Sequence, residues 1–461
     1  MSNIEQCAPT TNTELEPPAV VSEEEEACRP SQGGLHGYFN VVGLFFVYFI
    51  TLGQLSAFST YQDYYEEKML ASYSPSTISW IGTSQVFLLG IVGLLSGALY
   101  DRGHTHVALI PGFVSIVLGL LLLSFSYQYW HVLLSQGFLV GIGGGLVYIP
   151  AISIVSLGFP TKSALALGIA ATGSAIGGII WPIVFQRLLP EIGFAWTNRV
   201  FALMVLILAI ASYFTLTVSH PLNLKLLFHQ TKDENEYGSE SDTPVPKNKK
   251  RTVFLASLKG RAYQFLSLGI FFVLLGYWVP IFYLAPFASR SLNTSSARAA
   301  DLLSILNAAS LFGRVLPAAL GHKIGAANIL LAGATILGVL ILSWISIQNV
   351  VGITVWVIFL GFTAGSVITI PNAVGSLLSN PSETGLRLGV MWAVGAFAEL
   401  IGPPIAGALL TQHDGKVSYL GCQIFGGLSI LVGAGFLVVP AWSIMRRDQA
   451  KKGERATGSL T

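Results

Sequence analysis

Gly97-Ala98-Leu99-Tyr100-Asp101-Arg102-Gly103 is a short charged stretch set between two long apolar segments. About 20 largely apolar residues lie on each side of it, enough for a helix to cross roughly 30 Å of hydrocarbon. Its glycines allow two helix ends to approach closely, and Asp101 and Arg102 stand where the chain would leave the lipid. The stretch therefore predicts a tight turn between two membrane-spanning helices.

The region around this turn recurs later in the chain at a constant spacing. Three positions reappear 221 residues further on: Pro150 as Pro371, Gly168 as Gly389, and Pro182 as Pro403. The same offset carries Asp101 and Arg102 onto His322 and Lys323, again within a short turn. A constant offset across four helices indicates an internal duplication. Six spans per copy make a parallel repeat, the arrangement of carriers whose halves move about a central site.

The composition supports a membrane protein. Of the 461 residues, 52% are hydrophobic and 10% are charged, whereas a soluble domain usually carries about 25% charged residues. The three cysteines, two of them (Cys7 and Cys28) in a polar segment, offer no disulfide framework and are predicted to be free thiols. The net charge of +2 points to no particular partner.

The sequence predicts an all-α membrane protein with twelve transmembrane helices in two pseudo-symmetric six-helix halves. The expected spans are 37–58, 77–99, 105–127, 130–156, 163–187, 196–218, 264–288, 298–320, 326–346, 350–376, 385–410 and 418–443. The expected parts are a disordered cytosolic tail (1–34), the first half (35–218), a cytosolic linker (219–262), the second half (263–445) and a cytosolic tail (446–461). The first tail is polar and acidic, so it cannot bury a core.

The distribution of basic residues predicts the orientation. With both termini inside, the tails, linker and inner turns hold 18 of the 25 Lys and Arg residues. The outer loops hold six: Lys68, Arg187, Arg199, Arg290, Arg298 and Lys416. An excess of Lys and Arg marks the cytosolic side, so we expect cytosolic termini. The sequon at Asn293 then lies in an outer loop and is a candidate for glycosylation.

Several short motifs resemble a known family. The stretch from Gly97 to Gly103 resembles the loop motif of the major facilitator superfamily. More specific motifs resemble those of the monocarboxylate porter branch, especially its fungal members. The matching pieces are Gly33-Gly34, Tyr64-Tyr65-Glu66, Ile78-Ser79-Trp80-Ile81-Gly82, Asn307-Ala308-Ala309-Ser310 with Gly313-Arg314, and Gly402-Pro403-Pro404-Ile405-Ala406-Gly407. The resemblance covers nearly the whole chain apart from the tails and linker.

The sequence also departs from that branch. The acid that usually precedes the glycine pair is Gln32 here. The animal lactate and pyruvate transporters have an acid four residues before the eighth-span arginine, and here that position is Ser310. Their first-span lysine is absent as well. A different organic anion, or a larger acidic metabolite, fits the resemblance equally well.

Arg314 is the first candidate for substrate binding. A charge within a span is costly, so it usually faces an aqueous cavity or a partner. On a helical wheel Asn307, Ser310 and Arg314 fall within roughly 60° and form one polar stripe. Arginine is a permanent cation whose planar fork suits a carboxylate. The alternative is a structural arginine that pairs with helix-end carbonyls.

Glu399 is the second charged candidate within a span. Trp392, Gly395 and Gly402 share its helix face, where small residues let another helix approach. A carboxyl group in an apolar setting tends to hold a proton and can exchange it with a cavity. The alternative is a neutral acid bonded to a neighbouring helix. Because the equivalent positions in the first copy are glycines, charged chemistry is expected in the second half alone.

Other candidates lie at the membrane edge and in the seventh span. Asp101 and Arg102 are expected to gate the protein, because an inner turn that pairs with a neighbouring helix end would hold the cytosolic side closed. The alternative for this pair is a solvated loop. Tyr277, with its neighbours Trp278 and Tyr283, is a candidate for the cavity wall, although aromatic residues at membranes often only pack or form belts.

These features together predict a secondary transporter and not an enzyme. The histidines are scattered, and no metal-ligand pairing or phosphate-binding glycine loop occurs in the sequence. The expected partners are a small organic anion, protons as a coupling ion, and the lipid bilayer; no cofactor, metal or nucleic acid is expected. The first expectation is a monocarboxylate-like substrate, and the alternatives are export of a larger acidic secondary metabolite or a non-transporting nutrient sensor. The plasma membrane is the expected location, with an internal membrane such as the vacuole as the alternative.

Overall fold

The computed structural model describes residues 34–56, 58–159, 161–217, 260–413 and 416–458. These residues form long apolar helices and one short antiparallel hairpin, β1 (Thr411–His413) with β2 (Lys416–Ser418). Nearly all of the expected first tail and of the linker lies outside the described residues.

The first half runs from Leu35 to Thr217. Its helices are α2 (Leu35–Tyr48), α3 (Gln54–Ser56), α4 (Phe58–Tyr64), α5 (Pro75–Asp101), α6 (Thr105–Leu123), α7 (Tyr129–Val132), α8 (Gly141–Gly158) and α9 (Ser163–Thr217). Three π-helical segments join them: Phe49–Gly53, Tyr65–Met69 and Leu133–Val140. The first span therefore continues through α2 and α3 to Ser56, and the fourth through α7 and α8.

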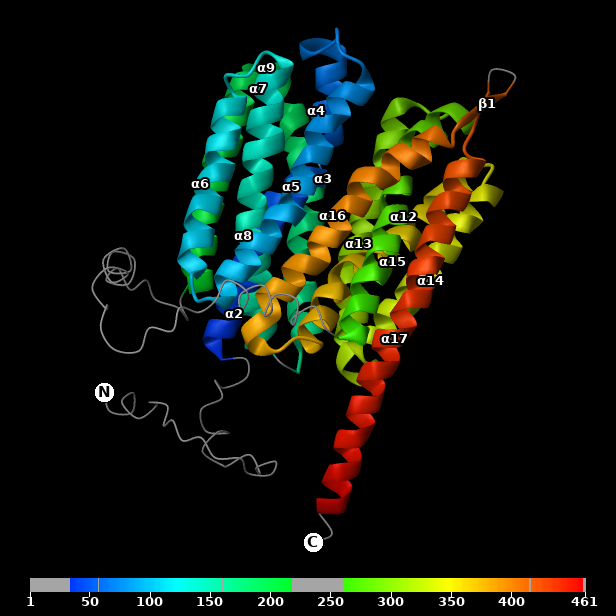
Figure 1. The fold of residues 1–461 in the computed structure, drawn as a ribbon. Coiled ribbons are helices and arrows are strands. Elements are labelled where there is room, and N and C mark those ends of the chain that lie inside the picture. The colour runs from blue at the N-terminus through cyan, green and yellow to red at the C-terminus, as the bar shows by residue number, and fades with distance from the viewer. Residues whose placement is uncertain (1–33, 57, 160, 218–259, 414–415, 459–461) are drawn as a thin grey trace, which may run out of the picture.

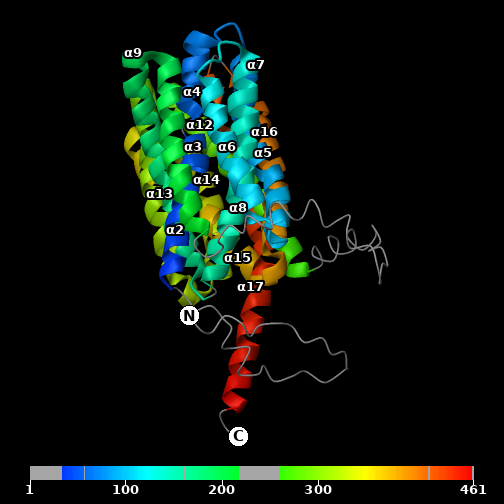
Figure 2. The ribbon, with the colours of Figure 1, turned by 90° about the vertical axis from the view of Figure 1, so that its left-hand side faces the viewer.

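The second half begins at Arg261. Its helices are α12 (Arg261–Ser291), α13 (Ser296–Ile324), α14 (Ala326–Ser343), α15 (Val350–Leu377), α16 (Thr384–Ala408) and α17 (Leu420–Gly458). Short 3-10 turns at Trp344–Ser346 and Pro381–Glu383 follow α14 and precede α16. Helix α17 continues beyond its apolar part and projects from the bundle (Figure 2).

The described helices account for twelve membrane crossings. Eleven helical segments are long and apolar enough to cross a membrane. One of them, α9, has 55 residues and contains a sharp break at Gly193 (φ 75°, ψ 170°). A straight helix of that length would measure about 80 Å, far more than a bilayer. Because α9 reverses at Gly193, its two arms are the fifth and sixth spans.

The charged stretch forms a tight turn, as the sequence predicts. Helix α5 ends at Asp101 and α6 begins at Thr105, so three residues join two spans. Gly103 has φ +79°, a conformation that favours glycine. In the second copy Gly325 has φ +91° between α13 and α14. Each turn therefore uses one glycine to reverse the chain.

Two helix crossings between the halves involve equivalent residues that are 221 positions apart in the sequence. Helix α5 packs against α16, and α13 packs against α9. A Cβ on Gly168 would lie 2.4 Å from the carbonyl oxygen of Arg314, and one on Gly389 would lie 2.8 Å from that of Gly93. Both pairs are related by 221 residues, so the same close contact is built twice. The duplication is thus a structural pseudo-symmetry, with glycine as the small residue at each crossing.

The halves form two neighbouring bundles that converge toward one end (Figure 1). We call that end the base; α2 begins there, and α5 and α13 end there. The opposite end, which carries the β1–β2 hairpin and the turn between α12 and α13, is the mouth.

Candidate functional site

A cavity lies between the two halves. The first half contributes Leu52, Leu55, Ser56, Val86, Leu89, Gly90, Tyr148 and Ser174 to its wall. The second half contributes Tyr277, Trp278, Arg314, Ile368, Trp392 and Glu399. Both charged groups of the wall belong to the second half, as the sequence led us to expect.

Arg314 reaches from α13 across the cavity wall to the first half. Its Nη1 donates hydrogen bonds to the carbonyl oxygen of Ala171 (3.0 Å) and to Oγ of Ser174 (2.6 Å), both on α9. The side chain is only 7% exposed, and its Nε has no hydrogen-bond partner. No carboxylate of the described residues lies within 4 Å of it. The guanidinium is therefore a buried cation that neutral groups hold in place.

Asn307 and Ser310 lie outside the cavity wall, although they share the polar stripe with Arg314. Ser310 Oγ donates to the carbonyl oxygen of Asn307 (2.8 Å), and the Asn307 amide donates to that of Leu303 (3.1 Å). Helix α15 approaches this face so closely that a Cβ on Gly365 would lie 2.3 Å from the Ser310 carbonyl oxygen. Asn307 lies against α9 instead, where a Cβ on Gly178 would lie 3.4 Å from its side-chain amide. Both positions are therefore packed against neighbouring helices, which a helical wheel does not show.

Glu399 and two aromatic residues of α12 form another part of the wall. Nε1 of Trp278 donates to Oε1 of Glu399 (3.0 Å). No cation of the described residues lies within 4 Å of this carboxyl group. Tyr277 lies beside Trp278 in the wall, whereas Tyr283 donates to the carbonyl oxygen of Pro403 (2.8 Å) and does not line the cavity.

A layer of aromatic and amide side chains connects the cavity with the contact between the halves. Nε1 of Trp392 donates to Oδ1 of Asn372 (2.7 Å), and Nδ2 of Asn372 donates to the hydroxyl of Tyr48 in the other half (3.4 Å). Tyr148 stands edge-on to both Tyr48 and Trp392, with ring centroids 5.5 and 5.9 Å apart. We call Tyr48, Tyr148, Asn372 and Trp392 the floor residues.

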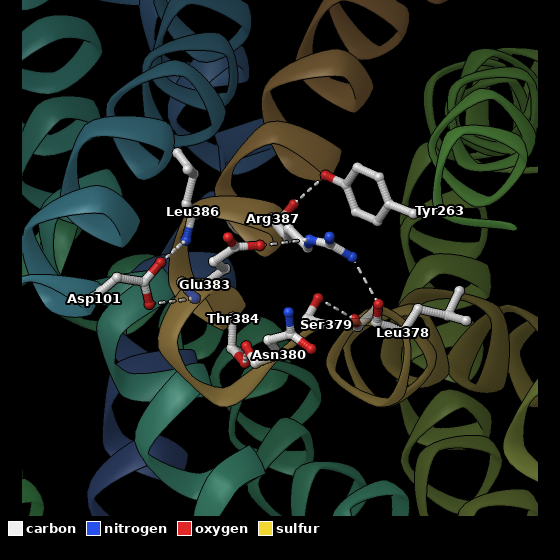
Figure 3. Close-up of polar contacts among 11 residues, drawn as sticks. Asp101, Tyr263, Leu378, Ser379, Asn380, Glu383, Thr384, Leu386 and Arg387 are labelled. Atoms are coloured by element: carbon white, nitrogen blue, oxygen red, sulfur yellow. Dashed lines mark hydrogen bonds and ion pairs between the residues drawn. The ribbon is translucent and has the colours of Figure 1, made fainter. Parts of the chain in front are cut away.

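Asp101 joins the halves at the base. Its two carboxylate oxygens accept hydrogen bonds from the backbone N–H groups of Gly385 (2.8 Å) and Leu386 (2.6 Å) at the start of α16 (Figure 3). The first N–H groups of a helix have no partner within the helix and favour a negative charge. Asp101 therefore caps a helix of the opposite half, a contact worth about 0.3–2 kcal/mol.

Residues of the second half hold the start of α16 in position for this contact. Arg387 Nε lies 3.4 Å from a carboxylate oxygen of Glu383, and its Nη1 donates to the carbonyl oxygen of Leu378 (2.7 Å). Tyr263 on α12 donates to the carbonyl oxygen of Arg387 (Figure 3). These bonds tie the first turn of α16 to α12 and to the end of α15.

The remaining predicted residues lie on the surface. Arg102 is exposed and donates to the carbonyl oxygen of Ala98 in its own helix (3.3 Å), so it makes no contact like that of Asp101. His322, the second-copy equivalent of Asp101, is exposed at the base. Asn293 is exposed at the mouth with φ +52°.

The floor residues were not predicted as a site, although the sequence carries a signal for them. Tyr148 lies two residues before Pro150, and Asn372 directly follows Pro371, its equivalent in the repeat. A neutral amide within a span needs a partner. An amide next to a helix proline is therefore the signal that the sequence carries for Asn372.

The fold and the cavity define a membrane carrier with two related halves around a central site. Residues 41–261 and 266–459 match the family model of the Major Facilitator Superfamily. The chain belongs to this superfamily. Membership in the monocarboxylate porter branch stays a prediction.

Curated relatives cover most of the chain. The "MFS-type transporter dbaD" of Emericella nidulans is 32% identical over 439 residues, which is 92% of this chain and 93% of that protein. The "Agnestins efflux protein AgnL12" of Paecilomyces divaricatus is 33% identical over 400 residues, 87% of this chain and 86% of that protein.

Solved structures share the fold at low identity. The transporter FucP in the outward conformation superposes with a TM-score of 0.63 at 16% identity, over 87% of this chain and 98% of that one. The human organic anion transporter MFSD10 gives 0.62 at 15% identity, over 87% of this chain and 98% of its own.

Proposed function

We propose that this transporter exports an acidic metabolite larger than lactate by secondary active transport. The observation that carries the proposal is Arg314, a buried guanidinium in the cavity wall with a free Nε and no carboxylate partner among the described residues. A buried charge without a counterion is costly, and a bound carboxylate would relieve that cost.

The size of the substrate is inferred from what the sequence lacks and from the relatives of the chain. The first-span lysine and the eighth-span acid of the lactate transporters are both absent. Relatives named as efflux proteins, such as the agnestins efflux protein, support export.

Two other functions remain candidates. The retained Arg314 favours uptake of a small monocarboxylate, the activity implied by the resemblance to the monocarboxylate porters. The second is a nutrient sensor, but the predicted linker is short, and a sensor on this scaffold commonly needs long signalling extensions.

A transport assay distinguishes these functions. The protein should be produced in a host without its own organic-acid carriers, and export and uptake of a labelled panel from lactate to multi-ring acids should be measured. We expect saturable export of the larger acids. Uptake restricted to lactate-sized acids would replace the proposal with the monocarboxylate function, and transport of neutral compounds alone would contradict both.

The proposed orientation places the base and both termini in the cytosol, with the mouth outside at the plasma membrane. A protease site inserted in the 219–262 linker should be cut only when protease is present inside the cell or in inside-out vesicles. Cleavage by external protease in intact cells would reverse the orientation. A glycan at Asn293 would lie at the mouth, on the same side as this orientation requires.

We propose that Glu399 carries the coupling proton, because it is a carboxyl group in the cavity wall with no nearby cation among the described residues. Glu399→Gln keeps the size and can still accept the bond from Trp278, but cannot gain or lose a proton. Export driven by an acidic exterior should therefore disappear, while exchange of labelled for unlabelled substrate continues. Loss of both activities would indicate a structural role, and full pH-driven export would remove Glu399 from coupling.

Asp101 is proposed to stabilise the state that is closed at the base. Asp101→Asn retains an acceptor oxygen but loses the charge and one of the two bonds to α16. A loss of about 1 kcal/mol predicts transport roughly fivefold slower at normal abundance. Asp301→Asn, which removes an exposed carboxylate on α13, is the matched control. Equal rates in the two variants would make Asp101 an ordinary turn residue.

A further inference from the structure

The cavity wall contains four aromatic side chains in two pairs. Tyr277 and Trp278 stand edge-to-face on α12, with ring centroids 5.6 Å apart and planes at 85°. Tyr148 and Trp392 form the other pair across the halves, with centroids 5.9 Å apart and planes at 80°. Tyr148 and Trp392 are almost fully buried, whereas Tyr277 and Trp278 are half-buried, so the accessible aromatic surface of the wall comes mainly from α12.

Both indole rings are already held in place. Nε1 of Trp278 is bound to Glu399, and Nε1 of Trp392 is bound to Asn372. Their donors are therefore satisfied by the protein, and the ring planes are oriented before any substrate arrives. A preorganised ring loses little conformational freedom when a ligand binds, so these side chains are suited to stacking.

The cavity also has aliphatic lining. Leu52 and Leu55 come from the first span, and Val86 and Leu89 come from α5. These side chains offer apolar surface and no hydrogen bond. A ligand in the cavity therefore meets aliphatic groups as well as aromatic and charged ones.

The polar groups of the aromatic wall are few. Arg314 lines the cavity, with its unpaired Nε buried, and the carboxyl group of Glu399 accepts a hydrogen bond from Trp278. Arg314 and Glu399 do not form an ion pair. Arg314, Tyr277 and Trp278 line the same cavity, so a ligand bound at Arg314 shares the cavity with both rings.

We infer that the substrate is a planar aromatic acid of at least two fused or conjugated rings. Its carboxylate or phenolate binds Arg314, its ring face stacks on the indole of Trp278, and its apolar edge contacts the leucines of the cavity wall. This inference rests on the anion site proposed above and adds the shape of the molecule that the anion belongs to.

A pair of acids with the same charge and carbon skeleton tests it. The purified full-length protein in nanodiscs is titrated with 2-naphthoate and with decahydronaphthalene-2-carboxylate, its saturated counterpart. Burial of apolar surface alone favours the saturated acid, whereas stacking favours the aromatic one. We expect 2-naphthoate to bind about tenfold more tightly.

Two substitutions of one tryptophan isolate the role of the ring. Trp278→Phe and Trp278→Leu both lose the bond to Glu399, but only the first keeps an aromatic face. The preference for 2-naphthoate should fall about three- to tenfold in Trp278→Leu and far less in Trp278→Phe. Trp80→Leu, at an exposed tryptophan of α5, is the control and should bind like the unmodified protein.

The outcomes separate this inference from the proposed function. Equal binding of both acids, with loss of both in Arg314→Ala, would overturn the aromatic substrate and leave the anion site intact. Binding of neither acid, or binding that survives Arg314→Ala, would overturn the anion site and this inference with it. The comparison in the unmodified protein does not depend on the folding of any variant.

Discussion

Replacing Arg314 with alanine should abolish saturable transport of an anionic substrate while the protein still reaches the membrane. The substitution removes the only buried cation of the described cavity wall, so a carboxylate in the cavity would lack a counterion. A lost charge-assisted bond of this kind costs about 3–5 kcal/mol, which corresponds to a loss of roughly 100-fold or more in affinity. The measurement is concentration-dependent transport at matched surface abundance.

Three further variants define what the arginine supplies. Arg314→Lys keeps the charge but loses the planar fork, so it should bind the anion more weakly and still insert. Ser310→Ala should have only a small effect, because the Ser310 hydroxyl is bonded within α13 and outside the cavity wall. Arg298→Ala is the control for removal of an exposed arginine on the same helix. An unchanged apparent affinity in Arg314→Ala would place the anion site elsewhere.

The fold follows from features that a single sequence displays. Span length, the charged turn before Gly103 and the 221-residue offset each reflect a local or repeated requirement, and the structure confirms the twelve crossings and the paired halves. The offset also relates two helix contacts: Gly168 packs against the backbone of Arg314, and its equivalent Gly389 packs against the backbone of Gly93. Because the same close helix contact requires a small residue in both copies, the glycine recurs in the sequence at the same offset.

The cavity was less predictable, because its wall depends on how helices from the two halves rotate against each other. Arg314, Glu399 and Tyr277 stood out as charged or aromatic residues within spans, and all three line the cavity. Asn307 and Ser310 have the same periodicity as Arg314 but lie outside its wall. A single sequence predicts which residues share a face of a helix, but it does not predict which neighbouring helices pack against each of them.

The base depends on two facing glycines, Gly97 and Gly385, of which the sequence motifs include only Gly97. A Cβ on Gly97 would lie 2.1 Å from the carbonyl oxygen of Gly385, and one on Gly385 would lie 2.8 Å from Oδ1 of Asp101. The bonds from Asp101 to α16 are thus made one helical turn from the closest approach of the two backbones. Any side chain at position 97 must push α16 away and lengthen those bonds.

Gly97→Ala should therefore destabilise the state that is closed at the base more than Asp101→Asn does. Overpacking against backbone costs about 1–3 kcal/mol, which shifts the equilibrium between the two states roughly 5- to 150-fold. In a cysteine-free background, a reporter cysteine at Ala318, buried where α13 crosses α9, should react faster with a reagent added from the base side. Transport should fall in parallel. Gly435→Ala on α17, where an added Cβ would meet nothing within 4 Å, is the control and should leave both readouts unchanged. If Gly97→Ala transports and labels like this control, the closed base does not limit transport and the proposed role of Asp101 fails with it.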